Sequence, residues 1–122
     1  MKSLESITTS LEVSKRLDTA LKKANIKVEP LFWWVKNNVY SYYGQSWIEY
    51  PFDTYLALTA SEIDNILPEM VFGHYIMTYK QDGEYYCIVR KDEISHIKFK
   101  GETLQDANGE MLCYLADNEL LK

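Results

Sequence analysis

The stretch YIMTYKQDGEYYCIVRKDEISHIKFK, residues 75–100, decides the fold of this chain. Its runs of β-branched and aromatic residues, Tyr75–Lys80 and Glu84–Arg90, predict two strands. Gln81-Asp82-Gly83 lies between them, and Asp-Gly is a strong hairpin signal because both residues accept a positive φ. Polar and apolar residues alternate over 94–100, which predicts a further strand beside the hairpin.

The segments before the hairpin predict two helices. Residues 9–24 carry apolar side chains at helical spacing, with a capping-box pattern at Thr9 and Glu12. Asn25 follows as a left-handed terminating residue. A second capping-box pattern, residues 59–62, begins a short helix that ends before Pro68, since the residue preceding a proline disfavours helical angles.

The remaining segments are shorter or weaker. Leu31–Val35 predicts a strand, 39–43 and 47–50 predict short strands, and 51–57 reads as an extended connection. A last helix begins after Thr103 and ends near Asp117. Gly109 inside it costs about 1 kcal/mol relative to alanine, so we expect tertiary contacts to hold this helix.

Together these elements predict one α+β domain over residues 1–122. Strands and helices do not alternate regularly, which argues against a parallel doubly wound sheet. We expect an antiparallel sheet of about four to five strands, with the N-terminal, short central and C-terminal helices packed mainly on one face.

Composition narrows the functional classes. The chain has 122 residues, 47% hydrophobic and 25% charged, which is typical of a globular domain. The net charge is −5 and no segment is strongly basic, so binding to duplex DNA is disfavoured. Two separated cysteines make no disulfide framework, and neither a secretory signal nor a long apolar run is visible, so we expect a cytoplasmic protein.

The sequence contains no local catalytic or metal motif. It has no phosphate loop, no Gly-x-Ser-x-Gly elbow and no Cys-x-x-Cys pair. His74 and His96 could meet Cys87 or Cys113 only through the fold, and the two cysteines read as small buried residues. We therefore expect no enzymatic activity, no catalytic residues, no metal ligands and no cofactor.

Aromatic residues are the unusual feature of the composition, with 10 tyrosines and 3 tryptophans. Aromatic side chains are enriched in the cores of protein interfaces. Because neighbouring strand residues point to opposite sides, Trp33 and Trp34 cannot enter the same core. In the hairpin both faces are partly apolar, so helices covering one would leave a tyrosine-rich face for a partner. The candidate interaction surface comprises Trp33, Trp34, Tyr40, Tyr42, Tyr43, Trp47 and Tyr50.

Three blocks of the sequence resemble a family of small uncharacterised proteins encoded in bacterial phage and prophage genomes. The blocks are LEVSKRL (11–17) with LFWWV (31–35), LALTASEI (56–63) running to Pro68, and TLQDA (103–107) followed by residues 111–112 and 114–115. They span nearly the whole chain in the family's order. The chain departs from the pattern at Asn108-Gly109 and in the aromatic segment 37–55. The resemblance implies a phage or prophage context and carries over no catalytic residue.

Three functions follow as hypotheses. The first is an accessory protein that acts by protein–protein contacts, self-association included, without catalysis. The second is a protein associated with single-stranded nucleic acid, which stacks on Tyr or Trp. Its electrostatic support is the basic set Lys80, Arg90, Lys91, Lys98 and Lys100. The third is an enzyme with a non-local site, which would need a pocket joining His74 or His96 to a carboxylate or a cysteine.

Overall fold

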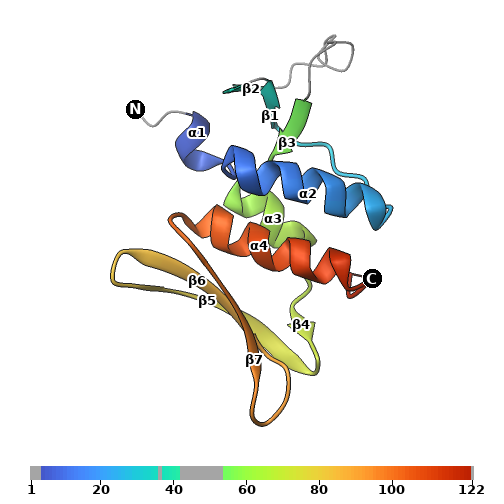
Figure 1. Ribbon diagram of the computed structural model, residues 1–122, viewed down its shortest axis with the longest axis vertical. Coiled ribbons are helices and arrows are strands. Elements are labelled where there is room, and N and C mark those ends of the chain that lie inside the picture. The colour runs from blue at the N-terminus through green and yellow to red at the C-terminus, as the bar shows by residue number, and fades with distance from the viewer. Residues whose placement is uncertain (1–3, 36, 42–53, 122) are drawn as a thin grey trace.

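The computed structural model describes residues 4–35, 37–41 and 54–121. Within these ranges the chain is α+β, with four helices and two antiparallel sheets (Figure 1). The helices form a layer between the sheets, and the smaller sheet lies at the end of the molecule that also holds α1. The helices are α1 (Leu4–Ile7), α2 (Leu11–Lys23), α3 (Ala60–Ile66) and α4 (Leu104–Asp117).

The larger sheet has the strand order β4-β5-β6-β7 and contains the predicted hairpin. Its strands are β4 (Met70–Val71), β5 (His74–Gln81), β6 (Glu84–Arg90) and β7 (His96–Gly101). Asp82 and Gly83 have φ values of 53° and 81°, as a two-residue turn with positive φ at both positions requires. The predicted hairpin and its neighbouring strand are therefore confirmed.

The smaller sheet has the order β2-β1-β3, formed by β2 (Asn38–Ser41), β1 (Phe32–Val35) and β3 (Thr54–Ala57). The expected antiparallel strands are thus divided between two sheets. The extended connection predicted for 51–57 is wrong over Thr54–Ala57, because β3 pairs with β1 and buries Leu56 and Ala57. The strand predicted at 47–50 lies outside the described residues.

The beginning of α2 differs from the prediction. Ser10, and not Thr9, is the N-cap, and its Oγ accepts a hydrogen bond from Val13 N at 3.3 Å. Thr9 is fully buried, with its hydroxyl 2.6 Å from Ser14 Oγ and accepting from Leu58 N. The predicted Thr9–Glu12 capping box is wrong because this hydroxyl is engaged by residues inside the fold.

The other helix ends match the prediction. Thr59 and Glu62 form the reciprocal capping box of α3. Asn25 has a φ of 61° directly after the cap of α2, and Thr103 caps α4. Leu121 packs against two of the core clusters, those that contain Leu17 and Met111, so the C-terminal segment folds back onto the core.

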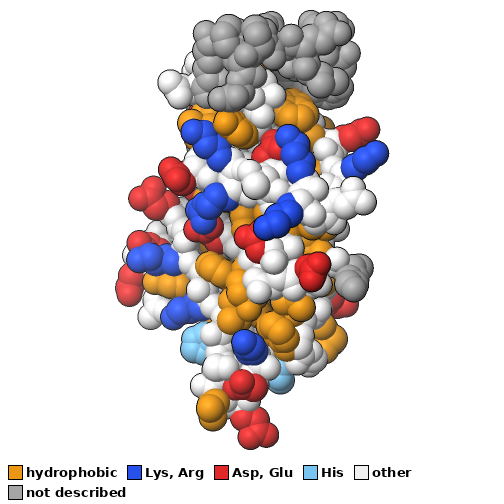
Figure 2. Space-filling model, turned by 45° about the vertical axis from the view of Figure 1, so that its right-hand side comes forward, with side chains coloured by type: hydrophobic (Ala, Val, Ile, Leu, Met, Phe, Trp, Pro, Cys, Tyr) orange, Lys and Arg blue, Asp and Glu red, His pale blue; other side chains and the backbone are white. Residues whose placement is uncertain are grey.

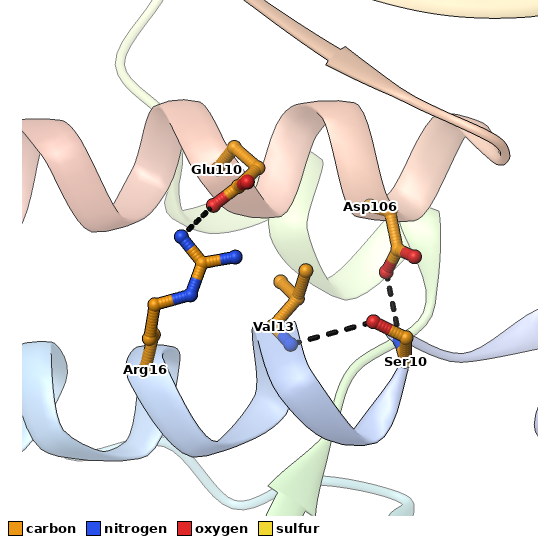
Figure 3. A network of polar contacts seen from close by, with 5 residues as sticks. All are labelled: Ser10, Val13, Arg16, Asp106 and Glu110. Carbon is orange, nitrogen blue, oxygen red and sulfur yellow. Dashed lines mark hydrogen bonds and ion pairs between the residues drawn. The ribbon is translucent and has the colours of Figure 1, made fainter.

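The pairing of α2 with α4 is the centre of the core. Gly109 lets the two helices approach closely, and a methyl group there would lie 2.9 Å from Val13 Cγ1. Ser10 N donates to Asp106 Oδ1 at 2.7 Å, and the Arg16 guanidinium forms an ion pair with Glu110 (Figure 3). The tertiary support that Gly109 was expected to need is provided by α2.

Candidate interaction surface

One side of the larger sheet is packed against α4 and the other is not covered by any described element. The register places Cys87, Val89 and Phe99 on the α4 side, within a core cluster that includes Met111 and Leu115. Side chains one residue along each strand point the other way. We call the uncovered side the open face; it comprises Tyr75, Met77, Tyr79, Gln81, Glu84, Tyr86, Ile88, Arg90, His96, Lys98 and Lys100.

Large apolar side chains are exposed along β5 on the open face. Tyr75 is 60% exposed, Met77 63% and Tyr79 38%. Met77 and Tyr79 are paired across the ladder with Ile88 and Tyr86, both half-buried. Apolar groups that cluster on an exposed surface are typical of a binding site, whereas single exposed ones are ordinary. The tyrosine-rich face expected from the sequence is therefore present.

The aromatic side chains of the open face contact one another and a cation. The rings of Tyr79 and Tyr86 are stacked, with centroids 4.9 Å apart and an interplanar angle of 13°. Lys98 Nζ lies 5.3 Å from the centre of the Tyr86 ring, within the range of a cation–π interaction. These contacts join β5, β6 and β7 and hold the side chains in place before any partner arrives.

The open face is more basic than the molecule as a whole. It carries Arg90, Lys98 and Lys100 against the one carboxylate of Glu84, which is 3.5 Å from Lys100 Nζ. Lys80 belongs to the other side of β5, where its Nζ lies 5.2 Å from the Tyr85 ring centre. On a chain of net charge −5, three basic side chains on one face favour an acidic partner.

Another face of the molecule carries acidic and basic side chains close together (Figure 2). In the view of Figure 2 they alternate over the helical half of the molecule. Hydrophobic side chains gather toward the half that holds the larger sheet (Figure 2). The charge excess of the open face therefore differs from the mixed pattern of this view.

A hollow of about 530 Å³ lies at one end of the open face. Its lining includes His74, His96, Arg90 and Glu93 beside Met77. Arg90 donates from Nε and Nη2 to the carbonyl oxygens of residues 92 and 93, at 3.0 and 2.9 Å, and so fixes the loop that closes the hollow. The fold thus brings both histidines and a carboxylate to one pocket.

The two histidines of this hollow are not held by the described residues around them. Both histidines are exposed, and within 4–35, 37–41 and 54–121 no hydrogen bond joins either of them to a carboxylate. The same residues contain no group of three potential metal ligands. The hollow has apolar and polar side chains together in its lining.

The cysteines lie inside the fold. Cys87 and Cys113 are buried, 0% and 6% exposed, and burial raises the pKa of each thiol to about 12. A thiol is nucleophilic as its thiolate, so neither side chain is activated at neutral pH. Their interpretation as small buried residues is confirmed.

The predicted aromatic surface is described in part. Trp34 is 7% exposed and its Nε1 donates to Thr9 O at 2.9 Å. Trp33, on the opposite side of β1, packs against the core cluster of α2, so the two indoles enter different clusters. Tyr40 is 41% exposed. Tyr42, Tyr43, Trp47 and Tyr50 lie outside the described residues, and their role as an interaction surface stays a prediction.

Sequence reasoning missed a buried carboxylate. Asp18 is 4% exposed; its Oδ2 accepts from Leu56 N at 3.1 Å, and its Oδ1 is 2.6 Å from Lys22 Nζ. It fastens α2 to β3, as a buried charge requires partners. The four-residue spacing of Asp18 and Lys22 was the available signal, but it is equally typical of an exposed helical pair.

The described part of the chain contains no helix long and apolar enough to cross a bilayer. Comparison of the whole chain with protein-family models, curated proteins and solved structures finds no match in any of the three.

Proposed function

We propose that this protein is a non-catalytic accessory protein that works by protein–protein contacts through the open face. The observation that carries the proposal is the exposure of Tyr75, Met77 and Tyr79 on a sheet whose other side is filled by α4. An apolar centre with a polar, charged border is the usual anatomy of an interface. A phage or prophage context is part of the same proposal and rests on the sequence resemblance.

The partner surface is acidic in this proposal. Arg90, Lys98 and Lys100 border the aromatic rows along β6 and β7. Two copies joined open face to open face would bring these cations together, and like charges across an interface are unfavourable. The partner in this proposal is therefore a different protein. Its acidic residues would face the basic border of the open face, and one apolar side chain would enter the hollow.

A photocrosslinking side chain placed at Met77 tests the proposal in cells that produce the protein. We expect adducts with one protein that are absent when the same group replaces Leu31, which is 59% exposed but lies just before β1. Adding Lys98→Glu and Lys100→Glu should reduce the adduct, because both reverse the charge that attracts an acidic partner. Adducts of equal yield at Leu31 and Met77, or none at Met77, would refute the open face as the contact surface.

Association with single-stranded nucleic acid is the second candidate, favoured by the stacked tyrosines beside Lys98 and Lys100. Aromatic rings and a basic groove are the features that bind single strands. Labelled oligothymidylate and oligouridylate, titrated at low salt, provide the test, since low salt is the most permissive condition. A salt-dependent anisotropy rise that Lys98→Glu removes would support this function, and a flat titration would exclude it.

A further inference from the structure

The outer edge of β5 is paired over only part of its length. β4 pairs with β5 at Met70–Tyr75 and Val71–His74, and Ile76 N donates to Glu69 O at 3.1 Å. Backbone groups alternate sides along an antiparallel strand, so those of Thr78 and Lys80 point outward as that of Ile76 does. In the described part of the chain no strand pairs with this outer edge beyond Ile76.

A groove of about 680 Å³ runs beside this free edge. Ile76 and Thr78 of β5 form one wall, and α3, the segment after it and α4 form the other. The core cluster of α4 includes Ile76 of β5 but does not extend to Thr78, which is exposed. The groove lies where this cover ends. The groove therefore offers open main-chain groups and side-chain space together.

The groove's polar lining favours a donor or a cation. Asp64 and Glu69 line it, and the described residues of its lining include no lysine or arginine. Asn108 also lines it, is 5% exposed, and its Oδ1 accepts no hydrogen bond from the described residues. A buried acceptor without a partner is unfavourable. The carboxylates of Asp64 and Glu69 favour a positively charged N–H donor in the groove.

We propose that this groove binds an extended segment of a partner protein, which adds as a strand to the free edge of β5 and places a basic side chain toward Asp64 and Glu69. The segment would continue the line of β4, with main-chain hydrogen bonds to Thr78 and Lys80. This inference rests on the proposed function, a protein that works by protein contacts, and adds a second contact surface to the open face.

The probe is a heptapeptide that alternates valine and threonine around one central lysine, with both ends blocked. Binding is followed by the amide resonances of the full chain. We expect shifts and slowed hydrogen exchange at Thr78 and Lys80, with Met77 and Tyr79, which already bond to β6, protected throughout. Two versions methylated on alternate backbone nitrogens are the matched controls, since a strand pairs through every second residue. One version should bind at least tenfold more weakly than the other.

Substitutions separate the contribution of the charge interaction from that of the main-chain hydrogen bonds. Asp64→Asn should weaken the lysine peptide about two- to fivefold and leave a lysine-free peptide unaffected. The matched control is Glu93→Gln, at a residue that lines the hollow of the open face. It should change the binding of neither peptide. Thr78→Pro removes the outward donor while leaving the bonds to β6, as proline is tolerated on edge strands. If it disturbs β5, the methylated peptides still test the same hydrogen bonds on the unaltered protein.

Two results of the peptide experiments would overturn the inference. One is the absence of shifts at Thr78 and Lys80 with ~1 mM peptide, a weak-binding limit; the other is equal binding of both methylated peptides. Neither touches the proposed function, which fails separately if the Met77 photocrosslinker forms no protein adduct. A dimer that protects the same edge in the free protein would assign the groove to a second copy and also overturn the proposal.

Discussion

Replacing Gly109 by alanine measures how tightly α2 and α4 are packed. The added methyl group would lie 2.9 Å from Val13 Cγ1 and 3.3 Å from Leu17 Cδ1 and Thr9 Cγ2. Carbon atoms in contact prefer about 3.5–4.0 Å. Val13 has little freedom to move away, because a β-branched side chain in a helix is held to one χ1 rotamer. The helices must separate slightly to accept the methyl group.

Two effects of opposite sign set the expected magnitude. Alanine is favoured over glycine inside a helix by about 1 kcal/mol. Overpacking a well-filled core costs typically about 1–3 kcal/mol. We expect the second to exceed the first, so that Gly109→Ala lowers the free energy of unfolding by about 1 kcal/mol.

Urea unfolding in two backgrounds is the assay. In wild type the midpoint should fall by about 0.5 M for an m-value near 2 kcal/mol/M. With Val13→Ala the nearest contact is removed, and Gly109→Ala should then be neutral or stabilising by up to about 1 kcal/mol. The four proteins form a double-mutant cycle, which gives the coupling energy between the two sites. The cost of Val13→Ala itself cancels in this difference. Equal stabilisation by Gly109→Ala in both backgrounds would refute the close packing.

Three further outcomes follow from the buried polar groups. Asp18→Ala should destabilise by about 1–3 kcal/mol in urea unfolding, because Leu56 N–H loses its acceptor; a smaller change than about 0.5 kcal/mol would contradict the bond. Desolvation raises the pKa of Asp106, so its contribution to stability is present below the ordinary carboxyl pKa and lost as pH rises through the raised value. Asp106→Asn, which keeps an acceptor for Ser10 N, should therefore gain stability relative to wild type as the pH rises above the ordinary carboxyl pKa of about 4, and a constant difference would refute this. Ellman's reagent should leave Cys87 and Cys113 unmodified in the native protein at pH 8 and modify both in denaturant; rapid native reaction would show that they are not sealed in the core.

The elements that the sequence predicted have signals contained within a few residues. Asp82-Gly83 fixes the hairpin turn by its own backbone preferences, and Thr59 with Glu62 caps α3 within one turn. Two of the elements that it missed, β4 and β3, depend on distant partners, whereas α1 is a single local turn that was also not predicted. The two residues of β4 are a strand only because β5 lies beside them, and β3 requires β1. Local propensity carries no information about such pairings.

The candidate surface was also predictable only where its signals are local. The alternation of side chains along β5 and β6 predicted a tyrosine-rich face. The expectation that helices cover one side of the sheet predicted that this face would be exposed. The hollow that joins His74 to His96 was not predictable, because the two residues come together across three paired strands. The burial of Trp34 has the same cause, since its indole hydrogen bond ends on Thr9, 25 residues earlier.

The bond between Ser10 and Asp106 has a consequence for how the chain folds. It joins residues 96 positions apart in the sequence. The other contacts between α2 and α4 join residues that are similarly far apart. Contacts of this kind slow folding, because a long loop must close before they form. The apolar stripe of α2 also packs against Leu56, Leu58 and Ile63, which emerge from the ribosome before α4. During synthesis we therefore expect only the part of α2 that faces α4 to stay uncovered, while the hairpin of 74–90 closes locally. We therefore expect the hairpin to form before the α2–α4 pair.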